Sequence, residues 1–152
     1  MKKYVVVIVF DGRLENVLLV RKMRPEWQKG LLNGPGGSVE DGESFLVASR
    51  RELSEETGLT EQQVHLEPLV RIQKKGEYDL GVFCGRLAGK PLVLLPEVPS
   101  TGEALVIRNW NSLSQYEVVP DLSYLVPLAY RKLTGNRLLS GVTMTLSFEE
   151  LP

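Results

Sequence analysis

The sequence predicts an α/β (α+β) fold in which a mixed β-sheet lies between two main helices. Val- and Ile-rich segments of strand length alternate with only two long helical patterns. Glycine and proline mark most boundaries between these segments, and neither an internal repeat nor a low-complexity tract interrupts them. The chain has 152 residues, which predicts a single domain over 1–152 that is long enough to bury a hydrophobic core.

The first segment of the chain is typical of a buried strand. Tyr4–Phe10 is rich in valine and isoleucine, Asp11 and Gly12 then indicate a turn, and Val17–Arg21 resumes the apolar pattern. We therefore expect a hairpin or a pair of neighbouring strands. A polar loop over 23–33 follows, and the glycine-rich run 34–37 is expected to lie outside any regular element.

The most regular helical pattern covers Ser44–Thr57. This segment contains neither glycine nor proline and is rich in leucine, alanine, glutamate and arginine. Asp41 or Ser44 can cap its N-terminus, and Gly58 stands where the glycine that ends a helix belongs.

The second half of the chain is predicted to be rich in strands, with one more helix. Pro120–Leu133 predicts that helix, with a proline in its first turn, where the missing N–H costs no hydrogen bond. His65 and Cys84 fall in predicted strands and are expected to be structural. The expected strands are 65–73, 78–87, 92–95, 104–110 and 142–148.

The charge balance and the scarcity of histidine and cysteine narrow the possible functions. Lys plus Arg total 18 and Asp plus Glu total 19, so the net charge is -1, which argues against bulk binding to nucleic acid or to an anionic membrane. The one cysteine, Cys84, excludes an internal disulfide framework. The one histidine, His65, leaves few ways to build a zinc site or a histidine-based triad. If the protein is an enzyme, its catalytic groups are therefore expected to be carboxylates.

The chain carries no segment that predicts membrane insertion. Its longest apolar run, Tyr4–Phe10, is far shorter than the roughly 20 residues that a spanning helix needs. Lys2 and Lys3 before that run imitate a secretion signal, but no small-residue cleavage site follows it. We expect a cytoplasmic protein in a reducing compartment.

Glu52, Glu55 and Glu56 form the most informative cluster in the sequence. Residues three and four apart share a helix face, so these carboxylates project within an arc of roughly 100°. Such an oxygen-rich negative face suits a hard divalent cation such as Mg²⁺, which in turn suits phosphate chemistry. A solvated helix face with Arg50 and Arg51 as partners would show the same spacing. The glycines just before the helix favour a site, because glycine lets the backbone approach a ligand closely.

The residues around these glutamates resemble a complete Nudix box. Gly37 is followed after five residues by Glu43, and after seven more by the run Arg51-Glu52-Leu53-Ser54-Glu55-Glu56-Thr57-Gly58-Leu59. Every fixed position of the box is filled, including its aliphatic positions. The resemblance implies the family's α/β/α sandwich. It also implies hydrolysis of a nucleoside diphosphate linked to another group, with Mg²⁺ or Mn²⁺ as the cofactor.

The resemblance also implies roles for the matching residues. Glu55 and Glu56 match the family's principal metal ligands, and the backbone carbonyl of Gly36 matches a further one. Glu52 matches a position that binds metal or helps to activate water. In-line attack by water on a phosphorus atom is the expected step.

Two other features of the family have counterparts in this chain. Arg51 and Glu43 match a pair that orients the site, and a charge-assisted hydrogen bond between them would hold the glutamates in place. The family often recruits another acid from a distant loop. Glu103 and Glu97 are the candidates, and Glu103 is preferred because it directly precedes the strand expected over 104–110.

Two stretches outside the box resemble the oxidised-purine nucleoside triphosphate hydrolases of the family. Asn33 matches an asparagine that contacts the base, and Asp121 matches one of two acids that contact the purine edge. The second acid is replaced by Leu122 and a preceding aromatic by Val119, so this purine clamp is incomplete. A turn role for Asn33 and a helix-capping role for Asp121 are the alternatives.

Trp27 and Arg24 are further candidate substrate contacts in the loop before the glycines. Trp27 has an indole that can stack on a base, and Arg24 can bind phosphate. Alternatively, Trp27 covers the core and Arg24 belongs to an ordinary solvated basic loop.

The sequence therefore predicts a Mg²⁺-dependent Nudix pyrophosphohydrolase. We expect it to cleave a nucleoside triphosphate, with oxidised purine dNTPs among the candidates, to the monophosphate and pyrophosphate. Dinucleoside polyphosphates, ADP-ribose and nucleotide sugars are alternative substrates. A non-catalytic Nudix-like module that senses nucleotides or binds a partner is an alternative of another class. The expected partner is a small-molecule nucleotide, and the chain is either a monomer or a homodimer.

Overall fold

The computed structural model describes residues 1–88, 102–135 and 144–148, so the strand expected over 92–95 lies outside the described residues. The mixed α/β fold with two main helices is confirmed. In chain order the elements are β1 (Lys2–Phe10), β2 (Asn16–Arg21), the 3₁₀-helix η1 (Glu26–Gln28), β3 (Leu32–Asn33), β4 (Gly36–Ser38), α1 (Phe45–Thr57), β5 (Glu67–Lys74), β6 (Tyr78–Arg86), β7 (Leu105–Asn109), the 3₁₀-helix η3 (Trp110–Ser112), α2 (Leu122–Leu133) and β8 (Met144–Phe148). None of the helices in these ranges is both long enough and apolar enough to cross a membrane.

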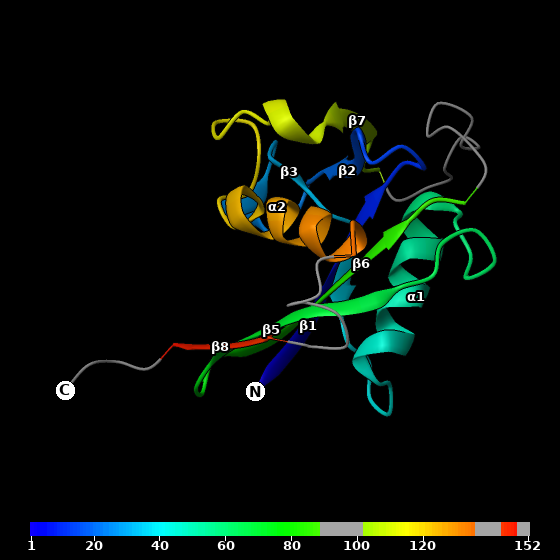
Figure 1. Cartoon of the computed structure of the whole chain (residues 1–152). Helices are drawn as coiled ribbons and strands as arrows, with labels where there is room; N and C mark the ends of the chain where they lie inside the picture. The colour runs from blue at the N-terminus through cyan, green and yellow to red at the C-terminus, as the bar shows by residue number, and fades with distance from the viewer. Residues whose placement is uncertain (89–101, 136–143, 149–152) are drawn as a thin grey trace.

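The strands named above form one mixed sheet in the order β3-β2-β1-β6-β5-β8, with β4 added to β1 and β7 added to β2. β1 is the central strand, because it runs parallel to β6 along its whole length and antiparallel to β2 and β4. The expected pairing of the first two strands is therefore confirmed. Figure 1 shows α1 and α2 on opposite sides of the strands, with β8 at one edge beside β5.

Each helix buries a separate hydrophobic cluster against the sheet. Side chains alternate between the two faces of a strand, so β1 contributes to both clusters. The α1 cluster contains Ala48 and Leu53 with Val5, Val7 and Val9 of β1. The α2 cluster contains Leu122, Leu125, Val126 and Ala129 with Ile8 and Phe10 of β1. Burial on both faces explains why this strand reads as a continuous apolar run.

The second half of the glycine-rich run, Gly36 and Gly37, belongs to β4, so the expectation that residues 34–37 lie outside regular structure was wrong for these two residues and holds for 34 and 35. β4 pairs antiparallel with β1. A Cβ atom on Gly36 would overlap the carbonyl oxygen of Val5, so only glycine lets this short strand approach so closely. The segment before α1 is consequently held against the centre of the sheet.

The two ends of α1 are fixed by the caps that the sequence predicts. The Ser44 hydroxyl accepts a hydrogen bond from the Val47 N–H at 3.1 Å. Gly58 ends the helix in the left-handed region, with φ of 73°. These caps set the register of the helix, and thereby the direction in which each glutamate points.

Two residues expected in strands have different surroundings. His65 is exposed and precedes β5, which begins at Glu67, and the adjacent Val64 makes an isolated bridge to Leu87. Cys84 is buried in β6, where burial raises the pKa of its thiol to about 12 and keeps it neutral.

Candidate active site

Glu52, Glu55 and Glu56 project from the last two turns of α1 into different surroundings. Glu56 is buried against the sheet. The Glu52 side chain is 13% exposed, whereas that of Glu55 is 57% exposed. The side chains on this helix face therefore range from exposed at Glu55 to buried at Glu56. On a purely solvated helix face, all three would be exposed.

Arg51 joins this helix face to the loop that precedes it. Its Nε and Nη2 atoms donate to the two carboxylate oxygens of Glu43 at 2.7 and 3.0 Å. Its Nη1 atom donates to Glu52 at 2.8 Å and to Glu55 at 3.3 Å, and Nη2 also donates to the Ser38 carbonyl at 2.9 Å. The hydrogen bonds from Arg51 hold the pKa of Glu43 below its usual value. The structure thus forms the expected Arg51–Glu43 pair. The same guanidinium group also binds Glu52 and Glu55.

Glu56 points toward the glycine-rich strand. Its Oε2 atom accepts a hydrogen bond from the Gly36 N–H at 3.2 Å. Burial, with smaller contributions from the charges of Glu103 and Glu52, raises the pKa of Glu56 to about 7, although Lys22 and the Gly36 hydrogen bond act to lower it. A carboxyl that holds its proton near neutral pH is poised to exchange that proton for a cation.

Glu103 reaches the site from a distant part of the chain. Its two carboxylate oxygens accept hydrogen bonds from Lys22 Nζ at 3.1 Å and from the Met23 N–H at 3.0 Å. Its negative charge is one of the smaller causes that raise the pKa of Glu56. The structure therefore places Glu103, the preferred candidate from the sequence, at the end of β2, whereas Glu97 lies outside the described residues.

The donor groups of this site fit a hard divalent cation. Carboxylate oxygens of Glu52, Glu56 and Glu103, with the Gly36 carbonyl, are ligands that Mg²⁺ and Mn²⁺ prefer. A Cβ atom on Gly37 would overlap the Glu52 carboxylate, so the glycine leaves room for it. In the three described ranges no three His, Cys, Asp or Glu side chains converge closely enough to enclose an ion as they stand. A cation would have to compete with the guanidinium group for Glu52.

The residues expected to recognise a base lie at the ends of two neighbouring segments. Leu32 of β3 is hydrogen bonded to Glu117 and Val119 in a parallel bridge. Asn33 comes directly after Leu32, and Asp121 comes two residues after Val119. Asn33 is buried, and its side-chain oxygen accepts from the Gly34 N–H at 2.8 Å while its NH₂ group donates to Gln28 at 3.1 Å. Asn33 is the last residue of β3 and not part of a turn, and these two hydrogen bonds fix its side chain.

Asp121 does not cap α2. Its backbone is helical, and its side chain makes no capping hydrogen bond, so the helix-capping alternative was wrong. Burial and then the Asp121 carboxyl raise the pKa of Tyr124 to about 12, which places this carboxyl beside the phenol. Leu122, at the position of the missing second acid, is 1% exposed and packs in the core. This segment therefore contains one of the two acids that the resemblance would require.

Trp27 and Arg24 lie on the outside of the loop between β2 and β3. Trp27 belongs to η1 and is 65% exposed, so it does not cover the core. Arg24 is also exposed. The neighbouring Gln28 is hydrogen bonded to Asn33, which ties this loop to β3.

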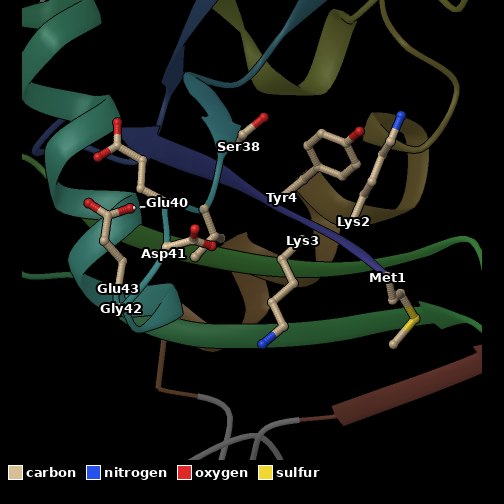
Figure 2. Close-up of a pocket in the computed structure, with 10 residues that line it drawn as sticks. Met1, Lys2, Lys3, Tyr4, Ser38, Glu40, Asp41, Gly42 and Glu43 are labelled. Atoms are coloured by element: carbon tan, nitrogen blue, oxygen red, sulfur yellow. Dashed lines mark hydrogen bonds between the residues drawn. The ribbon is translucent and has the colours of Figure 1, made fainter.

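A hollow of about 530 Å³ lies at the start of β1 and is lined by residues 1–4 and 38–43. Figure 2 shows Tyr4 on one side of β1 and Lys3 on the other, with Glu43 at the helix end of the hollow. Glu43 also anchors Arg51, whereas the three helix glutamates do not line the hollow. The hollow thus borders the candidate active site at its loop end.

The arrangement of a box-bearing helix on a central mixed sheet can be compared with known proteins. A family model of the NUDIX domain matches residues 2–125. The chain belongs to the NUDIX family. The match includes α1, the Glu103 segment and the start of α2, and it confirms the resemblance seen in the box.

Several curated proteins are similar to this NUDIX chain. It is 41% identical over 75 residues to the oxidized purine nucleoside triphosphate hydrolase of Danio rerio, covering 49% of this chain and 46% of that protein. It is 43% identical over 56 residues to the ADP-sugar pyrophosphatase of Mus musculus, covering 37% and 26%. It is 36% identical over 129 residues to the 8-oxo-dGDP phosphatase NUDT18 of Homo sapiens, covering 83% and 38%. The chain therefore spans less than half the length of these relatives.

Solved structures confirm the NUDIX fold. The NUDIX domain of Shewanella oneidensis NrtR, complexed with ADP ribose, has a TM-score of 0.70 at 17% identity, covering 86% of this chain and 87% of that one. A NUDIX hydrolase from Nitrosomonas europaea has a TM-score of 0.63 at 13% identity, covering 97% and 79%. A MutT structure from a study of Aliivibrio salmonicida and Vibrio cholerae has a TM-score of 0.61 at 20% identity, covering 83% and 97%.

Two contacts of the NUDIX site are not foreseen from the sequence. Lys22 and Glu103 are 81 positions apart, and no local pattern signals their hydrogen bond. The Ser38 carbonyl accepts from Arg51 because β4 pairs with β1. The one signal for this second contact is the glycine pair before Ser38, which indicates a close backbone approach.

Proposed function

We propose that this NUDIX chain is a Mg²⁺- or Mn²⁺-dependent pyrophosphohydrolase that cleaves a nucleoside triphosphate to the monophosphate and pyrophosphate. The buried Glu56 carboxyl carries this proposal, because it lies in the field of Glu52 and Glu103 and its pKa is raised to about 7. Carboxyls that repel one another in a buried site are costly unless a cation joins them. A module that only binds a nucleotide has no need for such a cluster.

Each residue of the site has a defined task under this proposal. A bound divalent cation supplies Lewis acidity at the phosphate oxygens and lowers the pKa of water. Glu52, Glu55, Glu56 and the Gly36 carbonyl would hold the cation, with Glu103 as a further ligand. One of these carboxylates accepts the proton of the attacking water.

Arg51 and Glu43 have an orienting task in the proposed reaction. The two-point hydrogen bond between them fixes the guanidinium group, and that group then fixes the directions of Glu52 and Glu55. The attacking water needs this orientation, because small displacements of positioned groups are costly in catalysis.

The substrate that we propose first is an oxidised purine deoxynucleoside triphosphate. Asn33 and Asp121 would hydrogen bond the base edge, Trp27 would stack on the base, and Arg24 would contact phosphate. The Danio rerio relative named for this substrate class supports the choice. We further propose that the chain acts in the cytoplasm on free nucleotides rather than on nucleic acid.

A nucleoside diphosphate with an oxidised base is the second candidate. The relative that aligns with 83% of the chain is named 8-oxo-dGDP phosphatase. The base contacts proposed for the first candidate would serve this substrate equally, and the two substrates differ by one phosphate.

The hydrolase proposal is tested by replacing Glu55 with glutamine. We expect pyrophosphate release in the presence of Mg²⁺ to fall at least about 10-fold, because losing a cation ligand should cost no less than losing a group that supports one. Glu61→Gln is the matched control, because Glu61 is also exposed and pairs with Arg50 of the same helix at 3.3 Å. Equal pyrophosphate or phosphate release by wild type and Glu55→Gln would contradict the proposal.

The substrate proposal is tested by a panel of normal and oxidised dNTPs and dNDPs, ADP-ribose and dinucleoside polyphosphates. We expect kcat/KM to be highest for an oxidised purine dNTP. Asp121→Asn should lower kcat/KM for that substrate about tenfold, the size of one lost charged hydrogen bond, with the exposed Asp41→Asn as control. Higher kcat/KM for the oxidised diphosphate would select the second candidate, and a preference for ADP-ribose would overturn both.

A further inference from the structure

Phe45, the first residue of α1, lies directly on the backbone of β6. A Cβ atom built on Gly81 would be 2.8 Å from Cδ1 and 3.1 Å from Cγ of the Phe45 ring. Gly81 is in the middle of a strand, where glycine ordinarily weakens the sheet. The ring fills the space that another residue's side chain would occupy, so this glycine provides the position in which Phe45 sits.

Arg71 holds the ring in that position. It is the partner of Gly81 across the β5–β6 pair, and its guanidinium carbon lies 5.3 Å from the centre of the Phe45 ring, within cation–π range. Asp79 is 1% exposed and accepts from Arg71 Nε at 2.8 Å, with a second hydrogen bond from Nη2. The hydrogen bonds from Arg71 hold the pKa of Asp79 below its usual value. A fixed guanidinium group thus covers the ring.

This contact lies next to the residues that orient the candidate active site. Ser44, which caps the helix, precedes Phe45, and Glu43 precedes Ser44. Glu43 in turn holds Arg51 by two hydrogen bonds. A displacement of Phe45 along the sheet would therefore move Glu43, and with it the guanidinium group that fixes Glu52 and Glu55.

We infer that Phe45 and Arg71 are positioning residues for the reaction of the helix glutamates, a role that rests on the proposed function. They act through Glu43 and Arg51 and do not touch substrate. Asp79 supports them by fixing the plane of the Arg71 guanidinium group. The contact sets where α1 begins on the sheet, and thus where the carboxylates meet a cation.

Three single variants and one double variant test this role. Phe45→Leu keeps the apolar contact but removes the ring, and Arg71→Lys keeps a charge beside Asp79 but removes the planar group. We expect each to lower kcat about tenfold, with KM for the nucleotide unchanged within about twofold, because supporting groups affect the reacting geometry. The double variant should be no slower than the slower single variant, since both changes break one contact. Phe45→Tyr keeps the aromatic ring and should have the same kcat as wild type.

The control is Val64→Ala, which loosens a similar contact outside the site. Val64 is buried and fills the space beside Gly85, in the same strand as Gly81. It should lower Tm without changing kcat. If Phe45→Leu lowers only Tm, as Val64→Ala does, the positioning role is wrong. Additive losses of kcat in the double variant would also overturn it.

Mn²⁺ affinity, measured by titration calorimetry, separates this role from the proposed function. We expect Phe45→Leu to weaken Mn²⁺ binding severalfold, with Val64→Ala and Phe45→Tyr matching wild type. If wild type hydrolyses no nucleotide, the proposed function fails, and the Mn²⁺ affinities alone decide the positioning role. Equal affinities in wild type and Phe45→Leu would then contradict it.

Discussion

Replacing Glu56 by glutamine is expected to lower kcat for nucleotide hydrolysis by at least about 10²-fold, within the range for loss of a positioned acid or base. Glutamine keeps the size of the side chain and its oxygen can still accept from the Gly36 N–H, so the packing at the end of α1 should persist. What is lost is the negative charge that a cation needs. The measurement is steady-state hydrolysis with Mg²⁺, with Glu61→Gln as the charge-matched control.

The same variant has a predicted effect on the pH dependence of stability. The pKa of Glu56 is about 7 in the folded chain against a usual value of 4.5, so the folded state binds this proton more tightly than the unfolded state. Stability from this group is present at low pH and falls as the pH rises from 4.5 to 7. With one pKa unit worth about 1.4 kcal/mol, the loss is on the order of 3 kcal/mol.

Urea unfolding with a chelator at pH 5 and pH 7.5 measures this effect. As the pH rises from 5 to 7.5, the free energy of unfolding should fall in wild type but not in Glu56→Gln, because the variant has no buried carboxyl to ionise. Mg²⁺ should stabilise wild type more at pH 7.5 than at pH 5, since the cation replaces a proton. Parallel pH profiles for the two proteins would show that Glu56 does not titrate in this range.

Gly37→Ala should lower kcat at least about tenfold while changing Tm by only a few degrees, since a displaced catalytic group costs more in rate than in stability. Its Cβ atom would overlap the carboxylate of Glu52, which is the far end of a flexible side chain and can turn away. Turning away moves Glu52 from its hydrogen bond with Arg51 at 2.8 Å. The active site should therefore change more than the fold.

Gly36→Ala provides the contrast for this prediction. Its Cβ atom would overlap the backbone carbonyl of Val5 in the central strand, which cannot move without disturbing the sheet. We expect it to cost about 1–3 kcal/mol of stability, as overpacking does. Thermal unfolding and kcat of the two variants should therefore separate. Wild-type kcat in Gly37→Ala would show that the position of Glu52 does not matter.

The sequence predicts the elements whose signals are local. Ser44 and Gly58 predict the two ends of α1. The spacing of Glu52, Glu55 and Glu56 predicts that they share one face of this helix. The family resemblance adds the Arg51–Glu43 pair, and the structure forms it. These features depend on residues within one helix and the loop before it, which is why a linear pattern can carry them.

Features that depend on tertiary pairing are the ones the sequence does not predict. The glycine-rich run forms β4 only because β1 provides a partner strand, and the hydrogen bond between Lys22 and Glu103 needs β2 and β7 to be neighbours. The side chain of Asp121 lies beside Tyr124 instead of capping α2, because its backbone already has helical angles. Local propensity gives no information about such contacts.

The position of β1 in the sheet has a consequence for how the chain folds. Residues 2–10 pair in parallel with residues 78–86, and α1 lies between them in the sequence. During synthesis, β1 therefore cannot pair with β6 until β6 has left the ribosome. Its valine-rich edge stays unpaired for that time, which favours slow folding and association with other chains. We expect this protein to need low temperature or a chaperone for efficient production.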